Sequence, residues 1–303
     1  MESFRDIGAR LSNWNRWGPD DERGTVNFIT PEKLVSAARL VRTGKVFDLG
    51  IPFSANGPQP GGLRVNPVHL MRETGENQDF PGGFRFADDY VFMPLQSASQ
   101  WDALAHVFYD GKLYNGYPSA LVDSYGAAKL SIDKQGKGIA GRGVLLDVAR
   151  VKGVDHLQAG EVITPIDLDQ AMREHGVQVG SGDILLVRTG WRNVFTSTGD
   201  PRAFMNGEPG VGLGCCEWLH DREIAAIACD NWAVEVLPSE TDDALPVHCV
   251  LIRDLGMTLG EILDFEELSG DCAEDGVYEF FLTAPPIKFA KAVGSPINPL
   301  AIK

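Results

Sequence analysis

Short apolar runs of strand length recur along the chain, while only two stretches keep helical spacing. Continuous runs of apolar and β-branched residues bounded by turn formers are typical of buried strands. Runs of this kind predict strands at residues 46–49, 90–95, 143–148, 183–189, 224–229 and 277–282. Because so few helices interleave with these strands, the pattern predicts a single domain of the α/β or α+β class, without a regular series of βαβ units.

The two helical segments both begin with the dipeptide Thr-Pro. Thr30 and Thr164 each supply a hydroxyl that caps a helix, and the proline that follows occupies a position where no amide donor is needed. Gly44 and Gly176 follow the last residues of helical spacing. The pattern therefore predicts helices that end at these two glycines.

Residues 54–89 break the alternation of apolar runs and turns. They are rich in Gly, Pro, Asn and charged residues. This composition predicts a long irregular excursion from the domain, and such segments serve as lids, as dimer arms or as plain surface insertions.

The net charge of the 303-residue chain is −15 at neutral pH. Nucleic acids and anionic membranes both require a basic surface, so we expect neither as a partner. The apolar runs are too short to span a bilayer, and the first residues lack the apolar core of a secretory signal. The sequence therefore predicts a cytoplasmic protein.

Two common hydrolytic nucleophiles are disfavoured. The pattern Gly-x-Ser-x-Gly of serine α/β-hydrolases is absent. Cys215 and Cys216 lie close to His220, but neighbours on a short helix rarely form a catalytic dyad. The five cysteines are odd in number and lack paired metal-binding spacing, so we expect buried free thiols.

Polar side chains gather directly after the predicted strand at 90–95. Gln96, Gln100 and Asp102 occupy even positions, so in an extended chain they project from one face, and His106 follows. Amide, carboxylate and imidazole groups together can hold a metal ion and move a proton. The alternative is a polar strand end with capping side chains.

A second polar pair lies farther along the chain. His248 and Glu261 each follow an apolar stretch, so both could point inward. The pair is a candidate part of the same site if the chain folds it against Asp102 and His106.

The segment 96–106 resembles a motif of the metal-dependent cyclase/hydrolase family that includes bacterial kynurenine formamidase and isatin hydrolase. That family carries His-x-Gly-Thr-His-x-Asp-x-Pro-x-His, and this chain has the same spacing with glutamine at both early histidine positions. The segment is also similar to Gln-x-x-x-Gln-x-Asp-x-x-x-His of the trans-dienelactone hydrolase branch. Residues 246–248 and 260–261 resemble the second metal-binding segment of the family, and 182–191 resembles a family strand.

This resemblance implies an α/β domain over residues 1–303 with a swivelling β/β/α architecture, a mixed sheet in its core and assembly into a homodimer or higher homo-oligomer. It also implies a divalent metal ion. The implied metal ligands are Gln96, Gln100, Asp102 and His248. His106 is the implied catalytic residue for proton transfer. Glu261 matches the second metal-binding segment and is a further catalytic candidate, because it could share the base role if it is not a ligand. Imidazole suits zinc whereas amide and carboxylate oxygens suit manganese, magnesium or calcium, so we expect Mn or Zn.

The implied activity is hydrolysis of a lactone, ester or cyclic amide of a small metabolite, including aromatic-derived ones. Four tryptophans are candidates for walls around a flat substrate, although a place in the core is the stronger alternative for each: Trp14, Trp17, Trp101 and Trp232. One alternative is a metal-free cyclase or lyase that uses His106 and Glu261 as an acid/base pair. Another is a non-catalytic small-molecule binder in which the two glutamines mark a degraded site.

Overall fold

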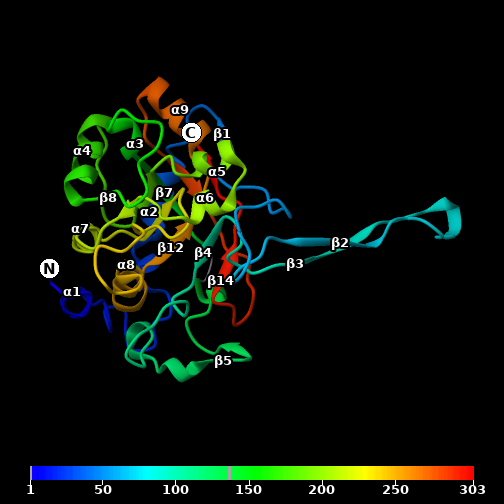
Figure 1. Cartoon of the computed structure of the whole chain (residues 1–303), viewed down its shortest axis with the longest axis horizontal. Helices are drawn as coiled ribbons and strands as arrows, with labels where there is room; N and C mark the ends of the chain where they lie inside the picture. Colours follow the sequence, from blue (N-terminus) through cyan, green and yellow to red (C-terminus); the bar gives the residue numbers. More distant parts are fainter. Residues whose placement is uncertain (1, 136–137) are drawn as a thin grey trace.

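A mixed nine-stranded sheet forms the centre of the computed structural model, which describes residues 2–135 and 138–303 (Figure 1). In spatial order its strands are β1 (Val46–Asp48), β15 (Leu300–Ile302), β13 (Glu279–Thr283), β7 (Ala140–Asp147), β9 (Ile184–Arg188), β11 (Ala226–Cys229), β12 (Thr258–Glu261), β4 (Gln100–Asp102) and β14 (Gly294–Pro296). The four central strands β7, β9, β11 and β12 run parallel to one another. The strands on either side of this group pair antiparallel, so the sheet is mixed as predicted.

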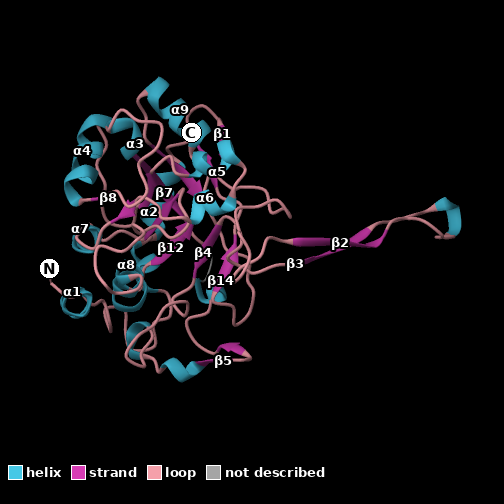
Figure 2. Cartoon of the chain, in the orientation of Figure 1, coloured by secondary structure: helices cyan, strands magenta, loops and turns pink. Residues whose placement is uncertain are grey.

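Helices surround this sheet (Figure 2). The α-helices are α1 (Phe4–Leu11), α2 (Pro31–Ala38), α3 (Val148–Val151), α4 (Pro165–His175), α5 (Arg192–Thr198), α6 (Pro201–Met205), α7 (Cys215–Asp221), α8 (Pro246–His248) and α9 (Glu266–Asp275), and a π-helix, η6 (Cys249–Leu255), continues α8. Single 3-10 turns are η1 (Gly24–Phe28), η2 (Pro81–Gly83), η3 (Tyr114–Gly116), η4 (Ser119–Leu121) and η5 (Ile132–Gln135). Three small two-stranded sheets pair β2 (Val68–Glu73) with β3 (Asp88–Phe92), β5 (Val122–Asp123) with β6 (Gly126–Ala127), and β8 (Val162–Ile163) with β10 (Gly210–Val211).

The predicted helix caps are confirmed. The Thr164 hydroxyl accepts a hydrogen bond from the Asp167 amide, and the Asp167 carboxylate accepts one from the Thr164 amide, which closes a capping box. Gly176 ends this helix with a φ of 63°, a conformation that glycine adopts at little cost. Thr30 caps α2 as predicted, but α2 ends at Ala38, well before Gly44.

The predicted strand at 90–95 is only partly correct. Pairing ends at Phe92, and all five residues of β3 are exposed, so this strand does not enter the core. β3 instead pairs with β2 in a hairpin that projects far from the body of the molecule (Figure 1). An apolar run predicts extended backbone, but it does not tell what covers that backbone. The segment 54–89, expected to be irregular, contains β2 and the start of β3.

The central strands β9 and β11 are buried along their whole length, which is typical of parallel strands covered on both faces. All five cysteines are buried and free, as predicted. Among the described residues, none of the helices is long and apolar enough to cross a membrane.

The contact between β4 and β12 depends on a glycine. A Cβ atom at Gly260 would lie 2.5 Å from the ring of Trp101 and 2.7 Å from the Cβ atom of Ala228. Trp101 is fully buried, and its indole nitrogen donates a hydrogen bond to the carbonyl oxygen of Ala284 at 2.8 Å. The tryptophan therefore fills the space beside Gly260 and holds the two strands at a fixed separation.

We expect Gly260→Ala to lower the free energy of unfolding by about 1–3 kcal/mol, because the added methyl group overpacks this contact. Gly270→Ala is the matched control. A Cβ atom at Gly270 meets no other atom within 4 Å, and the residue lies in the interior of α9. The control should raise the free energy of unfolding by about 0.5–1 kcal/mol. Urea unfolding measures both, and equal effects of the two substitutions would contradict this account of the strand contact.

Candidate active site

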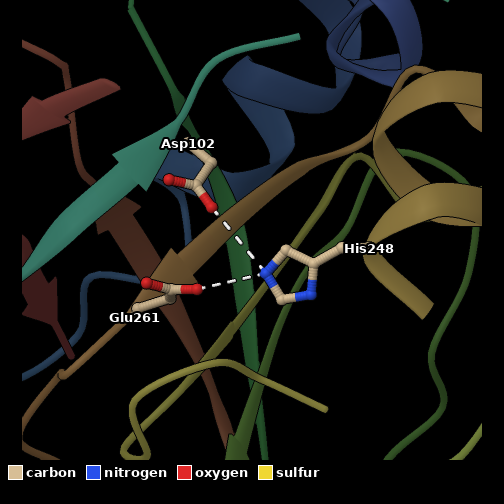
Figure 3. A group of neighbouring side chains, drawn as sticks. All are labelled: Asp102, His248 and Glu261. Atoms are coloured by element: carbon tan, nitrogen blue, oxygen red, sulfur yellow. Dashed lines mark hydrogen bonds and ion pairs between the residues drawn. The ribbon is translucent and has the colours of Figure 1, made fainter. Parts of the chain in front are cut away.

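Three buried candidate side chains come from two paired strands and one short helix. β4 and β12 are antiparallel, with Gln100 opposite Glu261 and Trp101 opposite Gly260. Since side chains alternate along a strand, Gln100 and Asp102 project from one face of β4, and Asp102 becomes a diagonal neighbour of Glu261. His248 is the last residue of α8 and faces the same point (Figure 3).

Asp102, His248 and Glu261 form a compact buried cluster. One ligand atom from each lies within 4.8 Å of the others. The Nε2 atom of His248 is 3.3 Å from a Glu261 oxygen and 3.9 Å from an Asp102 oxygen. Dashed lines mark both contacts in Figure 3. The family resemblance implied that these two distant segments contribute to one site, and the fold brings Asp102, His248 and Glu261 together.

Glu235 fixes the orientation of His248. Its carboxylate accepts a hydrogen bond from Nδ1 of His248 at 2.5 Å and from the backbone amides of Val247 and His248 at 3.2 and 2.8 Å. With Nδ1 engaged, Nε2 is the ring nitrogen that faces Asp102 and Glu261. Sequence reasoning missed Glu235, because it stands in an apolar stretch with no motif around it.

The histidine and Asp102 both show strongly shifted pKa values. Burial alone would lower the pKa of His248, but the hydrogen bonds to Glu235 and Glu261 outweigh it and raise this pKa to about 10. Burial, together with the charge of Glu261, raises the pKa of Asp102 well above its ordinary range. A cation among these groups would compensate the buried carboxylates and compete with the proton on Nε2.

Unpartnered acceptors mark the same point. Both side-chain oxygens of Asp102 and the amide oxygen of Gln100 are buried without a hydrogen-bond partner, although the Gln100 amide nitrogen donates to Glu261. Buried polar atoms in native proteins almost always have partners. Carboxylate, amide and imidazole groups whose free lone pairs face one point can bind a divalent cation. The chemistry of these residues therefore fits a metal site.

His106 lies at the edge of the cluster. Its Nε2 atom is 3.6 Å from Asp102, and about a fifth of its side chain remains exposed (21%). Burial lowers the pKa of His106 to about 4. The imidazole of His106 therefore contacts the buried carboxylate of Asp102 on one side and is partly exposed to solvent on the other.

Gln96 lies beside the strand that pairs with Asp102. Its amide nitrogen is buried without a partner and lies against Gly294, the residue of β14 that pairs with Asp102. Gln96 and Gln100 are thus both close to the cluster, and their role as metal ligands stays a prediction.

The four tryptophans lie in different surroundings. Trp101 is fully buried, and its side chain lies on the face of β4 opposite to Gln100 and Asp102, which favours the alternative of a core aromatic. Trp14 donates its indole N–H to the carbonyl of Arg253, and Trp17 packs edge-on against Phe28. For Trp14 and Trp17 a substrate contact stays a prediction.

Trp232 lies beside a cation that sequence reasoning missed. The guanidinium carbon of Arg64 stands 4.8 Å from the centre of the Trp232 ring, and an Arg64 nitrogen lies 3.9 Å from Glu261. That Arg64 nitrogen and the Trp232 indole nitrogen are buried donors without partners. Arg64 belongs to the segment 54–89, where composition predicts only irregular structure.

Strained backbone accompanies the cluster. Val234, Leu245 and Ile262 adopt φ angles of 60°, 49° and 56°, a left-handed conformation that costs L-residues energy, most of all β-branched ones. Val234 precedes Glu235, Ile262 follows Glu261, and Leu245 precedes α8, which carries His248. Strain of this kind gathers at functional sites, where the surrounding structure holds it.

The fold and the buried cluster define an α/β protein with a site suited to a divalent cation. The model of the Cyclase family, described as "Putative cyclase", matches residues 47–236. A crystal structure described as a novel cyclase is 45% identical, with a TM-score of 0.91 over 98% of this chain and 99% of that chain. The chain belongs to the cyclase family.

More distant solved structures share the fold. Isatin hydrolase A from Labrenzia aggregata, bound to benzyl benzoate, is 18% identical, with a TM-score of 0.65 over 89% of this chain and 97% of that chain. A structure described as a "Potential Metal-Dependent Hydrolase With Cyclase Activity" is 15% identical, with a TM-score of 0.54 over 85% of this chain and 98% of that chain. No sequence among curated proteins matches this chain.

We expect Glu235→Ala to lower the free energy of unfolding by about 3–5 kcal/mol, because it leaves a buried imidazolium and two amides without their acceptor. Glu217→Ala is the control. Glu217 is half exposed in an ion pair with Arg10, so its loss should change the free energy of unfolding by less than about 0.5 kcal/mol. Thermal and urea unfolding test both, and a Glu235→Ala protein as stable as the control would contradict the assigned role.

Proposed function

We propose that this protein is a metal-dependent hydrolase that opens the carbonyl of a lactone, ester or cyclic amide in a small metabolite. The observation that carries the proposal is the buried Asp102–His248–Glu261 cluster with its unpartnered carboxylate oxygens. Membership of the cyclase family and the shared fold with isatin hydrolases support the same chemistry.

Asp102, His248 and Glu261 are the residues that would hold the metal ion, and Gln96 and Gln100 would add neutral amide oxygens. A divalent ion bound there lowers the pKa of a coordinated water and polarises a carbonyl oxygen. With two carboxylates, one imidazole and the two amides, the set suits manganese as well as zinc. Glu235 holds the imidazole in the orientation that this binding needs.

His106 is the proton-transfer residue in this proposal. It lies 3.6 Å from Asp102 but is not among the three clustered ligand residues, so its imidazole remains free to accept a proton from water or pass one to the leaving group. Glu261 is assigned to the metal and not to an independent base, because its oxygens already face His248 and Gln100.

Arg64 and Trp232 orient the substrate in this proposal. The Arg64 nitrogen beside Glu261 and the buried indole N–H of Trp232 both lack a hydrogen-bond partner, and each could donate to an oxygen of the bound substrate. Donors fixed before the reaction stabilise negative charge as it develops on a carbonyl oxygen. A flat ring, as in an aromatic-derived lactone or cyclic amide, would lie against the Trp232 ring. The glutamines at 96 and 100 favour the trans-dienelactone hydrolase branch within the family.

We expect His106→Ala to lower kcat by about 10²–10⁴-fold while the protein still binds manganese or zinc, since it removes proton transfer and leaves the ligands intact. Asp102→Ala should lose both turnover and metal binding. His220→Ala, which removes a surface histidine paired with Asp221, is the control and should keep both. A panel of lactones and cyclic amides measures turnover, and calorimetric titration measures metal binding.

Full turnover in either His106→Ala or Asp102→Ala would refute this assignment. If Asp102→Ala lost turnover but bound the metal as well as wild type, the ion would bind at a place other than the Asp102–His248–Glu261 cluster. Turnover by wild-type protein that resists chelators would favour a metal-free acid/base reaction.

A further inference from the structure

We propose that Gln59 and Asn66 are positioning residues that fold residues 57–66 into a closed loop and thereby hold Arg64 at the candidate site. This stretch, called the clasp loop below, lies in the segment 54–89, where composition predicts only an irregular excursion. The two residues act through Arg64, so their effect on turnover rests on the proposed function.

Arg64 needs support from its own segment to stay in place. An arginine side chain has many rotamers, and holding it in one position costs conformational entropy. Its Nη1 atom lies 3.9 Å from a Glu261 oxygen, too far for a hydrogen bond, and finds no partner among the described residues. The place of the guanidinium over the Trp232 ring is therefore set chiefly by the backbone that carries Arg64.

Regular secondary structure contributes little to the clasp loop. Gly61 and Arg64 form one isolated bridge across a tight turn, and β2 begins only at Val68. Gly61 and Gly62 have φ angles of 91° and 84°, which glycine adopts at little cost. The tip of the turn points to solvent, since Leu63 is 90% exposed. Arg64 thus stands where the chain returns from an exposed turn, and the loop has to be held at its two ends.

Asn66 closes the clasp loop. Its side-chain oxygen accepts a hydrogen bond from the backbone amide of Gln59 at 3.0 Å, and its side-chain nitrogen donates to the Gln59 carbonyl oxygen at 3.0 Å. This reciprocal pair imitates one rung of an antiparallel ladder between residues seven positions apart. Gly57 leaves room for it, because a Cβ atom there would lie 2.6 Å from the Asn66 oxygen. Arg64 lies inside the ring that this pair closes.

Gln59 ties the closed loop to the segment that carries the candidate ligands. Its side chain is buried, and its amide nitrogen donates to the carbonyl oxygens of Gln96 at 3.4 Å and Ser97 at 3.1 Å. Only the nitrogen of the amide can donate, so the two carbonyls fix the orientation of this side chain. Gln96 and Ser97 begin the segment 96–106, which includes Asp102. The loop and the buried cluster therefore share one frame.

Trp232 is held by a separate support. The buried carboxylate of Glu208 accepts hydrogen bonds from the backbone amides of Trp232 and Ala233, both at 2.7 Å. The guanidinium of Arg64 then meets the Trp232 ring at 4.8 Å, a cation–π distance. Each partner of this contact has its own anchor, so release of the clasp loop should uncover the Trp232 ring without moving it.

The first test measures how readily acrylamide, a neutral quencher, reaches Trp232 in the full-length protein. Arg64→Ala should raise the quenching constant of Trp232 by about twofold, because it uncovers one face of the ring. Asn66→Ala should raise it equally, and the double variant no further. Repeating each measurement with Trp232→Phe isolates this ring from the other tryptophans. Leu63→Ala, in the same loop but 90% exposed, is the control and should change nothing.

Gln59→Glu tests the other end of the clasp loop. It keeps the size of the side chain but removes both donors to the carbonyls of Gln96 and Ser97, so it should uncover Trp232 as Asn66→Ala does. Circular dichroism establishes that each variant is folded. If Asn66→Ala fails to fold, Gln59→Glu answers the same question.

The second test measures turnover of the lactone and cyclic-amide panel. Arg64→Ala and Asn66→Ala should each lower kcat/KM by about tenfold, the effect of losing one hydrogen bond from a charged donor. The double variant should be no worse than Arg64→Ala alone, and Leu63→Ala should match the wild type.

Unchanged quenching of Trp232 in folded Asn66→Ala and Gln59→Glu would overturn the clasp loop. Additive losses of kcat/KM in the double variant would also overturn it, because Asn66 would then act apart from Arg64. A wild type that turns over no member of the panel would refute the proposed function instead, while the quenching test would still decide whether Gln59 and Asn66 position Arg64.

Discussion

The carboxylates of Asp102 and Glu261 and the imidazole of His248 lie together at one buried point, and the surrounding fold must hold them there. Burying charged groups costs several kcal/mol each unless partners compensate them. Here Glu235 compensates His248, while both oxygens of Asp102 are left without a hydrogen-bond partner. Such an arrangement persists only where surrounding structure enforces it, and its free lone pairs are what a cation would engage.

The enforcing structure is the sheet. The antiparallel register of β4 and β12 makes Asp102 and Glu261 diagonal neighbours, and the contact of Trp101 with Gly260 prevents the strands from sliding or separating. A slip of one residue would send Asp102 into the apolar core and Trp101 into the site. The left-handed residues Val234 and Ile262 turn the chain directly before Glu235 and directly after Glu261.

Local features of the sequence were sufficient to predict several elements of the fold and part of the candidate site. The Thr164 cap and the Gly176 end were predictable because their interactions span only a few residues. The even spacing of Gln100 and Asp102 correctly gave them a common face. Arg64 was not predictable, because its place beside Glu261 joins residues far apart in the sequence. The exposed β3 was misplaced in the core for a related reason: an apolar run does not reveal which surface, if any, will cover the strand.

The central claim is that the buried cluster binds a divalent ion that hydrolysis requires. Elemental analysis of untagged protein purified without chelator, with turnover of a lactone and cyclic-amide panel on the same sample, tests it most directly. The account predicts about one manganese or zinc ion per chain, with turnover lost to chelator and restored by that metal. A metal-free protein that still hydrolyses substrate at the same rate, with or without added metal, would contradict it.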